Sequence, residues 1–280
     1  MGLVRAAAGL WLAVCSWAQT VHSLRLYSEF QRVDPFGQIL AVDRSSKPRE
    51  ILSPAVARNS FFSIHVAVTA APKAMYFLAL QSYPPGAFQW KIYRESFSNH
   101  SSGWIPDTLT EERPPYFELM PDTEVNIPGQ TTQLYLVDVW VPPDTPSSSV
   151  RLEVLVKSDS WRIAPMEVRV LPVTVPALPQ GQVVEPLPDV KLSADASAAK
   201  AMAAATSASP APPPVNLRAI IYRNALQDAA LARTLHPEAA ERCRGASSKQ
   251  DRLGAEGYLR VRDCLYRTAW KEPVRPQALK

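Results

Sequence analysis

The chain has 280 residues, of which 46% are hydrophobic, 20% are charged and 9% are aromatic, and its formal net charge is +4 at pH 7. This composition allows a packed core and excludes a wholly disordered chain, because disordered chains are poor in aromatic residues and rich in net charge. The 27 prolines exclude a mainly helical protein, and the lack of long apolar runs after the N-terminus excludes a multi-pass membrane protein.

The N-terminal segment has the layout of a secretory signal peptide. One cation, Arg5, precedes an apolar run over 6–15, and sites suited to a signal peptidase follow at Ala18 and Ser23. The run is too short to span a bilayer. We therefore predict a signal peptide over 1–23, with cleavage after Ala18 or Ser23, and a secreted or periplasmic protein.

The cysteines fit the same destination. Removal of the signal peptide would leave Cys243 and Cys264, and two cysteines in an oxidising compartment predict one disulfide bond. Two free buried thiols are the alternative. The signal peptide also has alternatives, namely a buried core helix or a lipoprotein modified at Cys15.

Residues 24–171 carry the pattern of an antiparallel β-sandwich. Half-buried strands are indicated by alternation of apolar and polar residues, and central strands by continuous apolar runs. The strands so predicted include 61–68, 75–80, 88–93, 134–141, 150–157 and 166–170. Proline-containing turns separate strands, and no amphipathic helix of three turns intervenes. We predict about seven to nine strands in two sheets.

Residues 172–214 differ in composition from the segments on either side. They contain nine prolines, eleven alanines and no aromatic residue. Such a segment buries too little apolar surface to fold alone, so we predict a disordered Pro/Ala-rich linker.

Residues 215–280 predict a small α-helical C-terminal domain. Apolar residues recur at helical spacing over 217–230 and 250–270, and Pro237 is suited to open a short helix that runs through Cys243. A core of this size is marginal, so a bridge to Cys264 would contribute usefully to its stability.

The positive charge is concentrated in this helical domain. Residues 215–280 contain 13 Lys and Arg against 7 Asp and Glu, a net charge of +6, whereas residues 1–214 carry −2. We predict a basic docking face for an anionic envelope surface or an acidic partner, formed by Arg218, Arg223, Arg260, Arg262 and Arg267. A solvated helix face is the alternative. Export makes nucleic acid an unsuitable partner.

The sequence offers little for catalysis. None of its four histidines has a second ligand at metal-binding spacing, and it contains neither a nucleophile elbow nor a phosphate-binding glycine loop. We therefore expect no enzyme activity, no cofactor and no metal. A hydrolase site of paired carboxylates in the long loop between Ser98 and Ile127 is a minor alternative, using Glu111, Glu112, Asp122 and Glu124.

Two tryptophans are candidate ligand-binding residues. Trp104 and Trp161 lie at junctions between predicted loops and strands. Exposed tryptophans on a sandwich can stack on sugar rings, which makes both residues candidates for glycan binding. The alternative is that they close the ends of the sandwich, because large aromatic side chains are mostly buried.

Three short motifs occur in order between residues 50 and 171. They are Arg58-Asn59, Pro106-Asp107-Thr108-Leu109 and Val137-Asp138-Val139-Trp140-Val141-Pro142. In this order they resemble the β-sandwich module found ahead of the catalytic barrel in some secreted bacterial glycoside hydrolases. The resemblance implies an immunoglobulin-like accessory fold. A barrel needs about 250 residues, which the chain after residue 171 does not have, so no catalytic residue of that family is carried over.

Together these patterns predict a non-enzymatic exported binding protein of the cell envelope. Its sandwich and helical modules would engage different partners, an envelope protein or a glycan, across the flexible linker. The alternative is a carbohydrate-binding accessory protein that works with a separate glycoside hydrolase. The first hypothesis requires independent modules, and the second requires that Trp104 and Trp161 share one accessible platform.

Overall fold

The computed structural model describes the chain in seven stretches, namely 21–44, 52–101, 103–114, 116–119, 127–176, 215–244 and 255–271. Several sequence predictions concern residues outside these stretches. They are residues 1–20 of the signal peptide, residues 177–214 of the linker, and the acidic residues Asp122 and Glu124.

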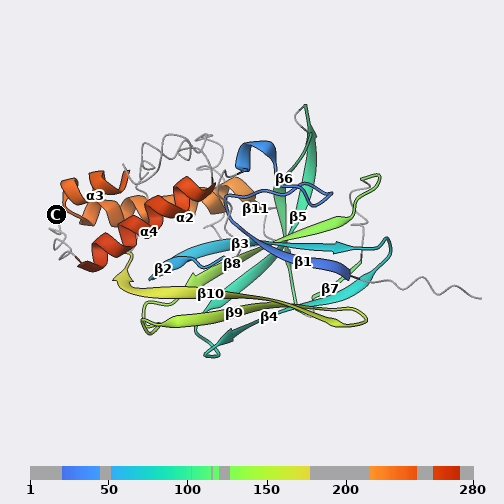
Figure 1. Ribbon diagram of the computed structural model, residues 1–280, viewed down its shortest axis with the longest axis horizontal. Coiled ribbons are helices and arrows are strands. Elements are labelled where there is room, and N and C mark those ends of the chain that lie inside the picture. Colours follow the sequence, from blue (N-terminus) through green and yellow to red (C-terminus); the bar gives the residue numbers. More distant parts are fainter. Residues whose placement is uncertain are drawn as a thin grey trace, which may run out of the picture.

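Two β-sheets face each other in the described chain (Figure 1). Their strands are β1 (Val21–Ser28), β2 (Ala55–Arg58), β3 (Ser60–Ala70), β4 (Met75–Tyr83), β5 (Gln89–His100), β6 (Gly103–Glu112), β7 (Tyr116–Leu119), β8 (Thr132–Val141), β9 (Ser149–Lys157), β10 (Trp161–Thr174) and β11 (Val215–Asn216). The six-stranded sheet has the order β1-β3-β8-β5-β6-β11, and the five-stranded sheet has the order β2-β10-β9-β4-β7. Neighbouring strands are antiparallel except β2 and β10.

The main core lies between the two sheets. Alternate residues of β3, β4, β8, β9 and β10 point inward and are buried there. The hydroxyl groups of Tyr76 and Tyr135 hydrogen-bond to each other at 2.5 Å, so each buried phenol has a polar partner. The predicted antiparallel sandwich is confirmed, and the apolar runs over 61–68, 75–80 and 134–141 lie in β3, β4 and β8, which have a neighbour on each side.

The chain crosses from one sheet to the other between β2 and β3. Asn59 lies at this corner with φ of 52°, a left-handed conformation that asparagine tolerates better than most residues. Its Nδ2 donates to the carbonyl oxygen of Val175 at 2.9 Å. The end of β10 is thereby attached to the corner from which β3 begins.

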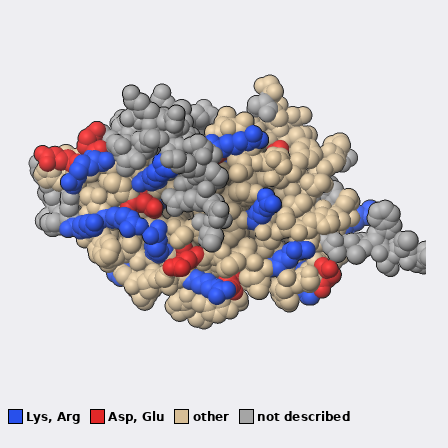
Figure 2. Space-filling view, viewed as in Figure 1, with Lys and Arg blue, Asp and Glu red and all other residues tan. Residues whose placement is uncertain are grey.

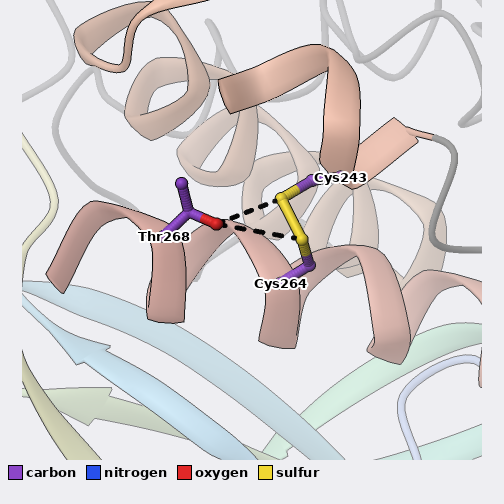
Figure 3. The surroundings of a disulfide bond; sticks show 3 residues. All are labelled: Cys243, Cys264 and Thr268. Atoms are coloured by element: carbon purple, nitrogen blue, oxygen red, sulfur yellow. Dashed lines mark hydrogen bonds between the residues drawn. A yellow bond between two sulfur atoms is a disulfide. The ribbon is translucent and has the colours of Figure 1, made fainter. Parts of the chain in front are cut away.

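Three helices follow, as the sequence predicts. They are α2 (Leu217–Thr234), α3 (Pro237–Arg244), which Pro237 opens, and α4 (Ala255–Lys271). The predicted cysteine pair is confirmed, because Sγ of Cys243 in α3 lies 2.11 Å from Sγ of Cys264 in α4 (Figure 3). The Thr268 hydroxyl lies 3.4 Å from Sγ of Cys243. In the described stretches, no helix has the length and hydropathy to cross a membrane.

The helices pack against the sandwich on both sides of the predicted boundaries at residues 171 and 215. Residues 172–174 belong to β10, and Val173 and Val175 are buried in a second core with Leu231 and Leu265. After the undescribed segment, β11 pairs with β6 in the six-stranded sheet. The helices lie at one end of the sandwich (Figure 1). Among the described residues, the helices and the sandwich thus share a core and a sheet.

The segment 98–127 is also more ordered than predicted. Residues 98–127 contain all of β6 and β7, together with the end of β5. The segment between β1 and β2 contains a 3-10 turn, η1 (Ala41–Asp43). Strand β6 pairs with β5 from Gly103 to Glu112, with one register shift near Phe97. The described part of the predicted long loop is thus mostly strand, with β6 in the six-stranded sheet and β7 in the five-stranded sheet.

Candidate functional site

The outer surface of the five-stranded sheet carries exposed apolar side chains. In β10, Met166, Val168 and Val170 point into the core, so the odd-numbered residues from Trp161 point outward. The side chains of Trp161 and Ile163 are 53% and 52% exposed. An outward sheet surface in contact with water is normally polar, so these positions depart from the usual alternation.

The strand register assembles these residues into two rows. Trp161 lies opposite Lys157, which lies opposite Phe77, and Ile163 lies opposite Leu155, which lies opposite Ala79. Met75 precedes this part of β4 and is 60% exposed. We define the apolar face as the outward side chains Met75, Phe77, Ala79, Leu155, Trp161 and Ile163.

Lys157 is the polar residue within these rows. Its ammonium nitrogen lies 5.8 Å from the centroid of the Trp161 ring and donates to the carbonyl oxygen of Asp159 at 3.0 Å. The next row of outward residues, farther from the β9–β10 turn, is more polar, because Gln81 Nε2 donates to Glu153 at 2.6 Å. The apolar face is therefore confined to the part of the sheet near the β9–β10 turn, which Figure 1 places far from the helices.

Trp104 does not join this face. It lies in β6 of the other sheet, opposite Asn99, and packs partly buried against a cluster with Phe97, Ile127 and Leu134. Leu134 belongs to the outer side of the six-stranded sheet, because Tyr135 beside it points inward. The two tryptophans therefore lie on opposite outer faces of the sandwich. The predicted platform shared by Trp104 and Trp161 is not formed.

The predicted basic face is only partly a surface. Arg262 is 4% exposed, and Arg223 is a largely covered residue that pairs with Asp138. Arg267 is exposed, Arg260 is half-buried, and the side chain of Arg218 lies outside the described ones. Figure 2 shows basic groups at the helical end of one face with acidic groups among them. Two of the five arginines predicted for the surface, Arg223 and Arg262, are instead packed between the helices and the six-stranded sheet.

These two arginines belong to a buried ion cluster between the helices and the outer side of the six-stranded sheet, which we define as Glu29, Asp138, Arg223, Asp228 and Arg262. Arg262 Nη1 contacts the Glu29 carboxylate, and its Nε donates to Asp228 at 3.0 Å. Arg223 donates to both oxygens of Asp138, at 2.9 and 2.6 Å. Residues from the strands and from both long helices thus compensate one another's charge.

Burial shifts the pKa values inside this cluster. Burial raises the pKa of Asp228 above its ordinary value, against the opposing effects of Arg262 and of the Tyr266 hydroxyl, which donates to it at 2.9 Å. Burial alone would lower the pKa of Arg262, but the carboxylates of Asp228 and Glu29 raise it well above its ordinary value. Arg262 is therefore charged at neutral pH.

Of the acidic residues proposed for hydrolysis, Glu111 and Glu112 are described, and their carboxylates do not face each other. Glu111 and Glu112 are consecutive residues of β6, so their side chains point to opposite sides of the strand. Lys91 Nζ lies 3.2 Å from Glu111, and Arg94 Nε lies 3.1 Å from Glu112. Both carboxylates are engaged in ion pairs across β5 and β6. Among the described residues, no group of His, Cys, Asp and Glu is arranged to hold a metal ion.

Comparisons with known proteins do not assign a family. No family model and no curated protein matches the chain. A family 123 glycoside hydrolase from Clostridium perfringens is 9% identical and has a TM-score of 0.37, with 55% of this chain covering 28% of that one. The C-terminal domain of the AgI/II polypeptide BspA from Streptococcus agalactiae is 10% identical with a TM-score of 0.27, over 53% of this chain and 50% of that one. Both TM-scores are below 0.5, so neither likeness assigns a family or a role to this chain.

Proposed function

We propose that this protein is a non-enzymatic binding protein that is exported to the cell envelope and docks on another protein through its apolar face. The observation that carries the proposal is the position of Trp161, Ile163 and Met75, which are more than half exposed on β10 and β4, the two strands that flank β9. The original hypothesis of two independently moving modules is not retained. In its place the helices brace the sandwich, and the opposite end of the five-stranded sheet is the binding surface.

The chemistry of the face favours a protein over a glycan. A sugar ring needs hydrogen-bonding side chains next to the aromatic residue on which it stacks. In the two rows that contain Trp161 and Ile163, five of the six outward residues are apolar and only Lys157 is polar. A protein surface with its own apolar residues and a carboxylate for Lys157 complements this arrangement.

Site-specific photo-crosslinking in cells tests the proposal directly. A photoreactive residue in place of Ile163 should give an adduct with one defined envelope protein, whereas the same residue in place of Val42, which is 70% exposed, should not. An adduct with a second copy of this chain would identify the face as a self-association surface. Equal labelling from both positions would contradict the proposal.

A matched pair of tryptophan variants gives the expected size of the effect. Trp161→Ala should weaken binding to the crosslinked partner by at least about tenfold, because aromatic anchors contribute disproportionately to interfaces. Trp270→Ala is the control, since Trp270 in α4 is 54% exposed, close to the exposure of Trp161. The affinities can be measured by titration calorimetry. Equal affinities of the two variants would contradict a role for the apolar face.

The alternative function is a carbohydrate-binding accessory protein, as the resemblance to the hydrolase module suggests. It is supported by Trp161 alone, because Trp104 lies on the other outer face. A glycan array distinguishes the two proposals. Binding of a glycan by the intact protein, lost in Trp161→Ala and kept in Trp270→Ala, would favour the carbohydrate function.

The proposed export, together with the contacts of β1, predicts where the signal peptide is cleaved. Val21 is fully buried, pairs with Ala70, and accepts a hydrogen bond from Nε of Arg162 at 2.7 Å through its carbonyl oxygen. Cleavage after Ser23 would remove these contacts, whereas cleavage after Ala18 would keep all of β1. We expect the mature protein to begin at Gln19, as measured by its intact mass after export. A mature chain that begins at Leu24 would contradict this expectation.

A further inference from the structure

His65 is fully buried on the outer side of β3, and both of its ring nitrogens face hydrogen-bond acceptors. Nδ1 lies 2.6 Å from Oε1 of Glu95, and Nε2 lies 3.3 Å from the backbone carbonyl oxygen of Glu29. A carboxylate and a carbonyl only accept hydrogen bonds, so both contacts form together when both ring nitrogens carry hydrogen. This geometry is the one that an imidazolium ring adopts when it pairs with the Glu95 carboxylate and donates to the Glu29 carbonyl oxygen.

Glu29 connects this pair to the helices. Its backbone carbonyl accepts from His65, while its carboxylate accepts from the backbone N–H of Ser63 at 3.1 Å. The same carboxylate accepts from Asn224 of α2 and from Arg262 of α4. The turn after β1 is thus fixed from the sheet by His65 and is bound by both long helices.

Other charged and titratable groups of the neighbouring elements face this region. They are Tyr27 of β1, Tyr93 of β5, Asp138 of β8, Arg223 and Asp228 of α2, and Arg262 and Tyr266 of α4. Tyr93 has its pKa raised to about 12, and the pKa of Tyr266 is raised well above its ordinary value, so neither titrates near neutral pH. Burial also raises the pKa of Asp228, but loss of its proton strengthens its attraction to Arg262, so His65 is the group here that loses a favourable charge as pH rises.

We propose that the His65–Glu95 pair is a pH-sensitive latch, in which the doubly protonated His65 fixes the Glu29 turn and loss of its proton loosens α2 and α4 from the sheet. A neutral imidazole keeps one N–H, and the charged Glu95 holds it at Nδ1. The lone pair at Nε2 then opposes the Glu29 carbonyl oxygen. Glu95 also loses its cation, and its Oε2 is already a buried atom without a hydrogen-bond partner in the described chain.

The direction of the pH dependence follows from the pKa of His65. Burial would lower this pKa, but the charge of Glu95 and the hydrogen bonds to Glu95 and Glu29 raise it above 6.5. The stabilisation by the pair is fully present below the unfolded pKa of about 6.5, and it is lost as pH rises through the folded pKa. The helices are thus held more firmly in mildly acidic than in alkaline solution.

Hydrogen exchange of the intact, disulfide-bonded chain tests the latch. After correction for base-catalysed exchange, protection of α2 and α4 should fall as pH rises from about 6, by up to about tenfold per pH unit between the unfolded pKa of about 6.5 and the folded pKa, and should then level off. Peptides from β4 and β9, which are far from the helices, serve as the internal reference and should lose less protection. Equal protection of the helices across this range, or an equal loss in both regions, would overturn the proposal.

Two histidine variants assign the effect. In His65→Gln the helix protection should be lower at about pH 6 and should no longer depend on pH, whereas His100→Gln, at the exposed end of β5, should behave as the unaltered chain. A pH dependence that persists in His65→Gln would overturn the proposal. Should His65→Gln not fold, titration of the His65 ring by NMR in the unaltered chain decides the matter. A folded pKa below 6.5 would then refute the latch.

Discussion

Arg262→Met should destabilise the protein by about 3–5 kcal/mol, because it leaves the carboxylates of Glu29 and Asp228 buried without their shared cation. Arg262 contacts both carboxylates and its guanidinium carbon lies 5.4 Å from the centroid of the Phe30 ring. Methionine fills a similar length of the site but supplies no donor. Urea unfolding, followed by helix circular dichroism and by tryptophan fluorescence, measures the change in the free energy of unfolding.

The control for this variant lies on the same helix. Arg267 is exposed in α4, so Arg267→Met should change the free energy of unfolding by less than about 0.5 kcal/mol. The two signals should also give one coincident transition in the unaltered chain, because the helices and sheets share a core. Equal stability of the two variants, or separate transitions for helices and sheets, would contradict this account of the interface.

The paired substitution Cys243→Ser with Cys264→Ser should lower the free energy of unfolding by about 3 kcal/mol. The bridge joins residues 21 positions apart, and cross-linking a loop of this length restricts the unfolded chain by about that amount. The loss of stability should be greatest in α3, because this bond joins α3 to α4. Burial of Cys243 adds to the cost, since serine places a hydroxyl in its apolar surroundings.

Reduction provides the control for the disulfide prediction. Treating the unaltered protein with a reductant should reproduce the unfolding midpoint of the double serine variant to within the small cost of the hydroxyls. Mass spectrometry without reductant should give a mass two units below the all-thiol value, since forming the bond removes two hydrogens. An unaltered midpoint on reduction would mean that the bridge contributes nothing to stability.

The sheet elements were predictable because their causes are local. The apolar run over 61–68, for example, predicts a strand wherever that strand lies in the fold, and Pro237 favours a helix start by fixing φ. His65 and Asp138 interrupt apolar runs, which signals buried polar partners, but nothing local shows that the partners are Glu95 and Arg223. The buried ion cluster was missed for this reason.

By itself, the sequence determined the β-sandwich, the three helices and the pairing of Cys243 with Cys264, since these depend on periodicity, turn residues and a count of cysteines. Only the tertiary structure decided that the helices pack on the sandwich, that Arg262 is buried while Arg267 is exposed, and that Trp104 and Trp161 lie on opposite faces. A helix sequence shows which residues share a face but not which surface that face meets. That choice depends on contacts between residues far apart in the chain, such as Glu29 and Arg262, which are separated by 233 positions.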